Sequence, residues 1–190
     1  MAWQKVSYKL TSDCPMIVHN GQTADPLNRF AKELKQVTGK RKKVDSDYEE
    51  LARIEFYAGL YMGKDGPIIP ATNIDALLIN AAKKSREGTA AKSGVFAAGD
   101  MRLEYEGPRT VDEMWKMDDF KFSALVRVGM ARVSRMRPIF REWSGVITLN
   151  YDDSVLNLSR LDDWMYAAGT QVGLGDWRPQ HGRFSVERLK

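Results

Sequence analysis

The sequence of 190 residues contains a single cysteine, Cys14, and only two histidines. One cysteine cannot form an internal disulfide or begin a C-x-x-C or zinc-knuckle pattern, so cysteine-based redox and metal sites are not expected. The longest apolar runs, such as residues 76–79, are far shorter than the roughly 20 residues of a membrane helix. The first five residues have no hydrophobic signal region. We therefore expect a cytoplasmic protein that does not contact a membrane.

The remaining composition is that of an ordinary globular protein. Hydrophobic residues make up 43% of the chain and charged residues 28%, which predicts one compact domain over residues 1–190 rather than a disordered or fibrous chain. Lysine and arginine (29) exceed aspartate and glutamate (25), for a formal net charge of +4. This mild excess would suit a polyanionic partner without requiring one.

The first elements are a strand and a helix. Apolar and polar residues alternate over residues 6–10, which predicts a half-buried strand. Asp25 followed by Pro26 predicts the start of a helix, with Asp25 as its N-cap. Apolar residues then recur at helical spacing over residues 27–37, and Gly39 ends the run.

A capping-box pattern and an alternating segment follow. Residues 46–49 predict the start of a short helix. Alternation over residues 54–62 predicts a strand with one buried face, and residues 63–66 predict a turn. Pro67 and Pro70 limit the return strand to a short or edge position.

The middle of the chain mixes short elements. Residues 74–81 have the apolar stripe of a helix, and lysines near its end suit the helix dipole. Residues 88–94 are rich in small side chains and predict a mobile loop. Residues 101–106 predict a strand, and residues 110–113 predict the start of a short helix.

The C-terminal segment is the most informative part of the sequence. A helix over residues 158–168, ended by Gly169, precedes a glycine-rich loop, and a strand follows from residue 184. Glycines allow close backbone approach to a ligand, arginines can hold phosphates, and tryptophan can stack on a base. The candidate nucleic-acid-binding residues of the loop are Gly173, Gly175, Trp177, Arg178, His181, Gly182 and Arg183.

Two known nucleotide motifs do not fit this loop. A dinucleotide fingerprint needs a strand before the glycines and a helix after them, which is the reverse of the predicted order, and the P-loop ending is absent. A purely structural interpretation stays open, in which the glycines serve turns, Trp177 covers the core edge and Arg178 pairs with Asp176 or with a C-terminal carbonyl.

Basic residues gather in two further places. An extended region over residues 125–151, broken at Pro138, carries candidate phosphate-binding arginines. Simple alternation along one strand puts Arg127, Arg135 and Arg137 on one face and Arg132 on the other. The second place is a basic run of Lys40, Arg41, Lys42 and Lys43, which would add nonspecific attraction as a flexible loop. Arginines that pair with acids, and a solvated loop, are the alternative interpretations.

Residues 126–189 combine a hairpin, a helix, a glycine-rich loop and a strand. This order resembles the C-terminal half of the repeat-associated (RAMP) superfamily of CRISPR proteins, and the segment 173–179 is similar to tailed-phage proteins that end in Gly-x-Gly-Asp-Trp-Arg-Pro. The resemblance implies an α+β fold with an antiparallel ferredoxin-like or RRM-like sheet and an insertion at about 40–121. It also implies binding of single-stranded nucleic acid, with RNA preferred to DNA, by a homo-oligomer along the strand.

Two other functions remain open. One is a phage interaction protein that imitates or inhibits a host CRISPR complex through protein contacts. The other is a RAMP-type RNA endonuclease, for which His19, His181, Asp13 and Asp25 are the candidate residues. The histidines lie in different predicted loops and Asp25 is predicted to cap a helix, so we predict no enzyme, no cofactor and no metal site.

Overall fold

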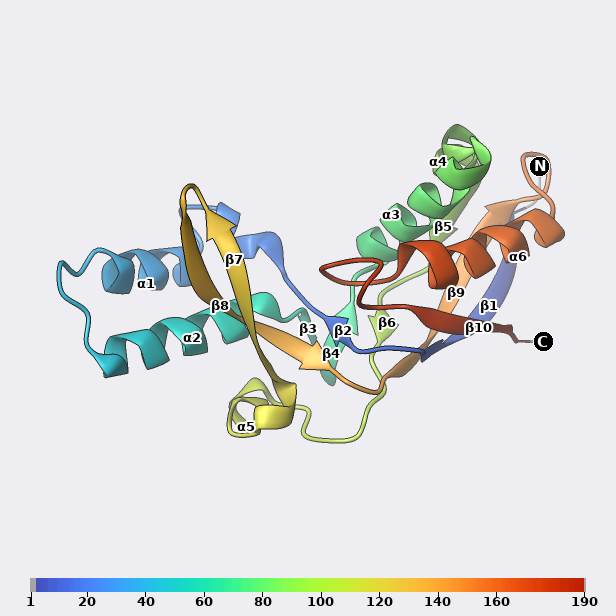
Figure 1. Cartoon of the computed structure of the whole chain (residues 1–190). Helices are drawn as coiled ribbons and strands as arrows, with labels where there is room; N and C mark the ends of the chain where they lie inside the picture. The colour runs from blue at the N-terminus through green and yellow to red at the C-terminus, as the bar shows by residue number, and fades with distance from the viewer. Residues whose placement is uncertain (1–2, 190) are drawn as a thin grey trace. The chain divides into compact units, whose positions relative to one another are not determined.

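The computed structural model describes residues 3–189, without the side chains of Val128 and Ala131. The chain forms two compact units, each made of discontinuous segments (Figure 1). The first unit consists of Met1–Met16, Met62–Glu106 and Arg141–Lys190, and the second of Ile17–Tyr61 and Gly107–Phe140. The fold is mixed α+β with antiparallel strand pairing. No helix within residues 3–189 is long and apolar enough to cross a membrane.

The main sheet of the first unit has four strands in the order β10-β1-β9-β5. The strands are β1 (Trp3–Ser12), β5 (Val95–Ala97), β9 (Ser144–Asp152) and β10 (Phe184–Arg188). All three neighbouring pairs are antiparallel. Along β1 the buried residues Val6, Tyr8 and Leu10 alternate with exposed or half-buried ones, so one face of the sheet belongs to the core.

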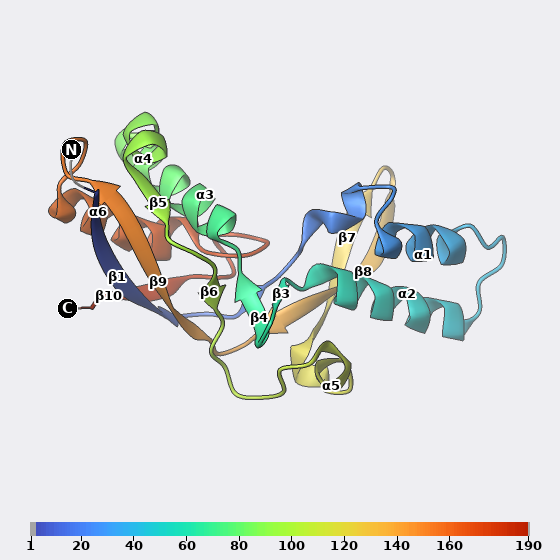
Figure 2. The same cartoon turned by 180° about the vertical axis from the view of Figure 1, so that it is seen from behind.

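Helices cover that buried face. The helical elements of this unit are α3 (Ala71–Ala82), η2 (Lys83–Ser85), α4 (Gly88–Gly94), α6 (Leu158–Ala167) and the π-helical turn η4 (Ala168–Val172). The Tyr8 hydroxyl donates to the Asp162 carboxylate of α6 at 2.8 Å, which identifies the Val6–Tyr8–Leu10 side as the side facing this helix. In Figure 1 α6 lies in front of the sheet, and in Figure 2 it lies behind it.

A small three-stranded sheet completes the first unit. Its strands are β3 (Met62–Gly63), β4 (Gly66–Ile69) and β6 (Met101–Arg102), in the order β3-β4-β6. The β3–β4 hairpin confirms the predicted turn at residues 63–66.

The second unit combines helices with a three-stranded sheet in the order β2-β8-β7. The strands are β2 (Met16–Ile17), β7 (Lys121–Val128) and β8 (Ala131–Phe140), and the helical elements are η1 (Gly21–Ala24), α1 (Arg29–Thr38), α2 (Asp45–Gly59), α5 (Val111–Trp115) and η3 (Asp118–Phe120). Phe56 of α2 is fully buried, with its ring 5.4 Å from that of Trp115. Gly59 lies so close to Pro138 of β8 that a Cβ would come within 2.7 Å of the proline Cδ.

Several sequence-based expectations are confirmed. The strands predicted at residues 6–10 and 184–186 are β1 and β10, the helix at 74–81 is α3, and the helix starting at 110–113 is α5. The insertion expected at 40–121 does not coincide with either unit, since Met62–Glu106, with α3 and β5, belongs to the first unit.

The strand predicted at residues 54–62 is wrong, because most of this segment is the C-terminal half of α2. Alternation would have left Glu55 on a solvent-facing side, but Glu55 is only 7% exposed and is paired with Arg135. Pairing with the half-buried Arg135 of β8 allows the charged Glu55 to lie on the buried side of the helix, which no period in the sequence reveals. The N-terminus of α2 also differs: Asp47 accepts the N–H of Val44 at 3.0 Å.

Two other predicted boundaries are corrected. Asn28, not Asp25, is the N-cap of α1, and its side chain accepts the N–H of Phe30 at 2.9 Å. The Asp25 carboxylate accepts the N–H of Leu27 instead, in a turn before the helix. Residues 88–94, predicted as a mobile loop, form α4, because its central alanines favour helix and Ala91 is fully buried.

The extended region 125–151 is not broken at Pro138, where a break was predicted. The chain turns at Gly129, whose φ is +60°, while Pro138 lies within β8 opposite Lys121. Gly169 does not end a helix but lies in η4, where a Cβ would come within 2.1 Å of the Phe184 carbonyl oxygen. Its lack of a side chain therefore allows β10 to approach closely.

Candidate nucleic-acid interface

The glycine-rich loop of the first unit is closed by backbone hydrogen bonds. The N–H of Leu174 donates to the Gly182 carbonyl at 2.8 Å, and the N–H of Gly182 donates to the Pro15 carbonyl at 2.9 Å. The Leu174 side chain is only 2% exposed. The two ends of the loop are therefore held together, and the loop has a defined internal conformation.

Gly173 and Gly182 are required for this closure. Their φ angles of +78° and +75° lie in the region that favours glycine. A Cβ on Gly182 would lie 1.7 Å from the Leu174 carbonyl oxygen, and one on Gly173 would lie 3.0 Å from the His181 carbonyl oxygen. These two glycines thus have the role that the structural interpretation assigned to them. Gly175 also has a positive φ of +82°.

Arg178 of this loop joins two lysines around a pocket of about 430 Å³. Lys83 and Lys84 come from the end of α3 and the following η2 turn. The pocket is lined by Asn80, Lys83, Lys84, Gln171, Val172, Arg178 and Pro179, and we call these residues the cation pocket. Segments far apart in the sequence thus contribute three positive charges to one site within one unit.

The charges of the cation pocket are available to an anion. No carboxylate lines it, and within residues 3–189 neither Lys83, Lys84 nor Arg178 forms an ion pair. The one side-chain hydrogen bond among them joins Lys83 Nζ to Asn80 Oδ1 at 3.4 Å. Clustered like charges in a recess raise the local concentration of anions, so the geometry suits a phosphate-bearing ligand.

Lys83 and Lys84 were not candidates from sequence, where they were assigned only to a helix end. The available signal was their density, two adjacent lysines followed closely by Arg86, but nothing in the sequence connects this segment to the loop after α6.

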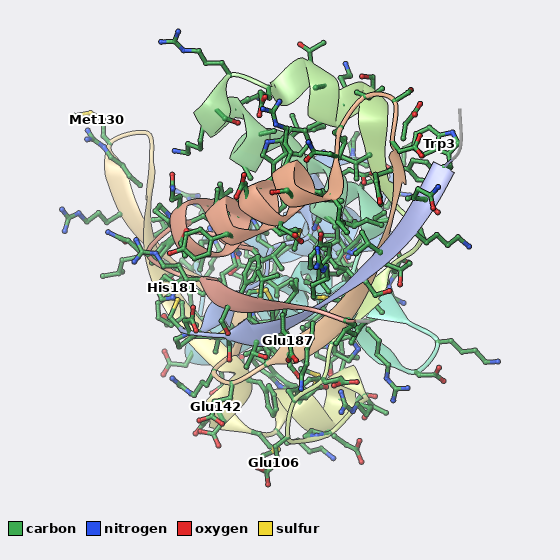
Figure 3. All side chains as sticks on the ribbon, turned by 90° about the vertical axis from the view of Figure 1, so that its right-hand side faces the viewer. Trp3, Glu106, Met130, Glu142, His181 and Glu187 are labelled. Atoms are coloured by element: carbon green, nitrogen blue, oxygen red, sulfur yellow. The ribbon has the colours of Figure 1, made fainter. Side chains whose placement is uncertain are left out.

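The aromatic residues of the loop lie beside each other. The ring centroids of Trp177 and His181 are 6.2 Å apart, and Trp177 is 38% exposed. The Asp176 carboxylate accepts the N–H of Trp177 at 3.0 Å, so it stabilises the loop backbone at this point. Figure 3 shows His181 in the loop that precedes β10. A half-exposed indole next to the cation pocket residue Arg178 is compatible with stacking on a base.

Arg183 is also exposed but is not among the residues that line the cation pocket. Its backbone is engaged: its carbonyl accepts the N–H of Asp13 at 2.9 Å, and its N–H donates to Cys14 Sγ at 3.2 Å. The structure therefore does not bring Arg178 and Arg183 into one pocket, although both belong to the same loop.

In the second unit, the four candidate arginines occupy different faces from those expected. Because the chain turns at Gly129, Arg127 of β7 lies directly opposite Arg132 of β8, and directly opposite residues share a face. Arg135 lies opposite Ala124, in the alternate set of positions. The expectation that Arg127 shares a face with Arg135 and Arg137 is therefore wrong, because it ignored the turn.

Arg135 and Arg137 are engaged by groups of the protein itself. Arg135 Nη1 lies 2.5 Å from the buried Glu55 carboxylate, and the same carboxylate accepts the N–H of Met136 at 2.8 Å. Arg137 donates to the Met136 carbonyl at 3.1 Å. Both arginines line a pocket of about 440 Å³ that also contains Lys35. Arg135 is neutralised by its partner, as the alternative interpretation of these arginines foresaw.

The basic run is partly fixed rather than a freely flexible loop. Lys40 Nζ lies 2.5 Å from the Asp47 carboxylate at the start of α2, and Lys43 Nζ donates to the Lys40 carbonyl at 3.1 Å. The hydrogen bond from Lys40 is the main cause that lowers the pKa of Asp47 below its ordinary value of 3.8. Arg41 and Lys42 are exposed and keep their charges available.

The candidate endonuclease residues are divided between the two units: His19 and Asp25 belong to the second, and Asp13 and His181 belong to the first. Asp25 is engaged by Leu27, and Asp13 uses its N–H to bind the Arg183 carbonyl. Within residues 3–189, no group of three or more histidine, cysteine, aspartate or glutamate side chains lies close enough to hold a metal ion.

No protein-family model matches the chain, and a search of curated proteins gives no match. The geometry of the site is therefore the basis for any functional conclusion.

Proposed function

We propose that the protein binds single-stranded nucleic acid, with RNA as the main ligand, without cutting it. The observation that carries this proposal is the cation pocket, where Lys83, Lys84 and Arg178 come from two separate segments and form no ion pair with any described residue. Phosphate contacts of lysine and arginine supply most of the affinity of proteins that bind nucleic acid without sequence preference. The adjacent, partly exposed Trp177 supplies a ring on which a base can stack.

We also propose a ferredoxin-like core for the first unit. Its elements follow the order β1, α3, β5, β9, α6, β10, and the sheet order is β10-β1-β9-β5. This is the β-α-β-β-α-β arrangement of the split βαβ motif, with the first strand between the last and the third. The second unit is then built from two insertions, one after β1 and one before β9.

The core arrangement and the glycine-rich loop between α6 and β10 support the resemblance to the RAMP superfamily. A backbone-type role follows from that resemblance: several copies of the chain would bind side by side along one strand. A 260/280 nm absorbance ratio above that of the protein alone would reveal nucleic acid retained through purification.

The test is a titration of labelled single-stranded RNA and DNA at several salt concentrations. For single strands, the slope of log affinity against log salt is about 0.7 per phosphate contact. Replacing Lys83, Lys84 and Arg178 by alanine together should therefore reduce the slope by about 2. The matched control replaces three exposed lysines elsewhere, Lys64, Lys92 and Lys116, and removes the same charge.

Equal slopes for the two triple variants would contradict the proposed site. Absence of binding by the unmodified chain at low salt would contradict the function, and would favour the interaction protein that acts through protein contacts. Cleavage of the labelled RNA, lost in a His181→Ala or Asp25→Ala variant that still binds, would establish the endonuclease instead.

A further inference from the structure

The main sheet of the first unit has a second face that the helices do not cover. The Val6–Tyr8–Leu10 side of β1 packs toward α6, so Trp3, Lys5 and the other odd-numbered residues of this strand point to the opposite side. Trp3, Lys5, Lys9 and Thr11 are all exposed. The register carries this face across β9 to β5.

Two large aromatic side chains are in contact on this open face. The ring centroids of Trp3 and Phe96 are 5.1 Å apart at an interplanar angle of 65°, and the side chains are 50% and 44% exposed. Figure 3 shows Trp3 near the start of β1. A single exposed aromatic needs no explanation, but two rings in mutual contact on an open sheet form an exposed π surface that a planar ligand can cover.

The side chains around the rings are polar or charged. Lys5, Asn150 and Phe96 form one cross-strand row, with Asn150 of β9 between the lysine and the ring. In the next row, the Ser7 and Thr148 hydroxyls are hydrogen-bonded at 2.9 Å.

Acidic residues lie at the margins of this face. The Asp152 carboxylate opposite Trp3 is 8% exposed and is engaged by Ser154. Glu187 of β10 lies opposite Lys9, away from the aromatic row (Figure 3). The positive charge next to the rings is therefore that of Lys5, which forms no ion pair within residues 3–189.

We propose that this face is a base-stacking platform, on which successive bases of a single strand stack against Trp3 and Phe96 while Lys5 contacts a phosphate. The inference rests on the proposed function and adds a second contact surface to it. A protein partner would need a wider apolar patch, whereas here two rings are bordered by an amide, hydroxyls and a lysine. That combination matches a nucleotide, which has a planar base, hydrogen-bonding edges and a negative charge.

The experiment compares two probes that share a backbone but differ in bases: a 12-nucleotide oligouridine and an abasic strand of the same length. Base stacking on one aromatic side chain is worth roughly 10-fold or more in affinity. The Trp3→Ala and Phe96→Ala variants should each bind oligouridine about 10-fold more weakly and bind the abasic strand unchanged. Any purification tag is placed at the C-terminus, away from Trp3.

Three further variants complete the design. Tyr166→Ala removes an aromatic that is 69% exposed on α6, and it should leave both affinities unchanged. Trp3→Phe keeps a ring and should retain most of the oligouridine affinity, which separates stacking from a general effect on folding. Lys5→Ala should weaken both probes and reduce the salt slope by about 0.7.

Oligouridine affinity that is unaffected by Trp3→Ala and Phe96→Ala would overturn the platform while leaving the proposed function standing. Equal losses for oligouridine and the abasic strand would overturn it as well, since they would show that the rings act through the fold. If the unmodified chain binds neither probe at low salt, the platform and the proposed function both fail.

Discussion

Replacing Gly182 by alanine tests whether the glycine-rich loop is held by its own backbone. Gly182 has a φ of +75°, and an added Cβ would lie 1.7 Å from the carbonyl oxygen of Leu174. That oxygen belongs to the backbone and cannot rotate away as a flexible side chain could. The loop must therefore open, and the hydrogen bond from the Leu174 N–H to the Gly182 carbonyl must lengthen or break.

The expected loss of stability has three sources. A left-handed backbone conformation costs alanine about 1 kcal/mol. The lost hydrogen bond contributes about 1 kcal/mol, and partial exposure of the buried Leu174 side chain contributes about 1 kcal/mol more. The free energy of unfolding should fall by about 3 kcal/mol, which for a chain of this size lowers Tm by roughly 6–12 °C.

The assay is thermal unfolding followed by circular dichroism, with Gly99→Ala as the matched control. Gly99 belongs to the same unit, and a Cβ there meets no atom within 4 Å, so its replacement should change stability by less than about 0.5 kcal/mol. Equal Tm values for the two variants would refute the closed loop. A Gly182→Ala protein that is stable but binds RNA poorly would show that Gly182 serves ligand approach instead.

Three further predictions concern the second unit. Glu55→Ala should lower the free energy of unfolding by about 3 kcal/mol in a denaturant titration, because it leaves a partly buried guanidinium unpaired; a loss below about 1 kcal/mol would contradict this. Lys40→Ala should lower Tm at pH 7 but not at acid pH. Because the pKa of Asp47 is lowered in the folded protein, the stabilisation by the Lys40–Asp47 pair is complete above the ordinary Asp47 pKa of 3.8 and is lost as the pH falls through the lower folded pKa. A Tm difference between the variant and the unmodified protein that persists in acid would count against the pair. Replacing both Arg127 and Arg132 by alanine should weaken RNA binding at low salt and should not lower Tm, because it removes two like charges that lie directly opposite each other; a fall in Tm would mark them as structural.

Periodicity predicted the elements whose burial is decided within their own segment. The stripe of α3, with Ile74 and Leu77 fully buried, and the alternation of β1 both follow the spacing in the sequence. The β3–β4 turn was predicted from the turn-forming residues of the segment 63–66, which are also a local signal. These elements belong to the framework of the first unit, but α4 of the same unit was predicted as a loop and no strand was predicted at β5.

Prediction failed where a distant partner decides the outcome. Residues 54–62 alternate well enough for a strand, and only the pairing of Glu55 with Arg135 explains why a charged side chain lies on the buried side of a helix. The prediction of the cation pocket was incomplete for the same reason, because some of its residues come from a distant part of the sequence. Arg178 was predicted from its loop, but Lys83 and Lys84 join it only because α3 ends beside that loop in the fold.

The hairpin arginines show how one turn changes the electrostatics of a surface. With Gly129 at the turn, Arg127 and Arg132 lie directly opposite each other, and like charges at directly opposite positions destabilise a strand pair. Arg127 Nε donates to the Gly129 carbonyl at 3.0 Å, which holds its guanidinium near the turn, and within residues 3–189 no carboxylate pairs with either arginine. A phosphate bound between the two guanidiniums would gain attraction to both and would also relieve their mutual repulsion. Arg135, by contrast, already has Glu55 as its counter-ion, so an anion arriving there would have to compete with a buried carboxylate. Among the candidate arginines of this unit, the pair at the hairpin turn is therefore the better anion site.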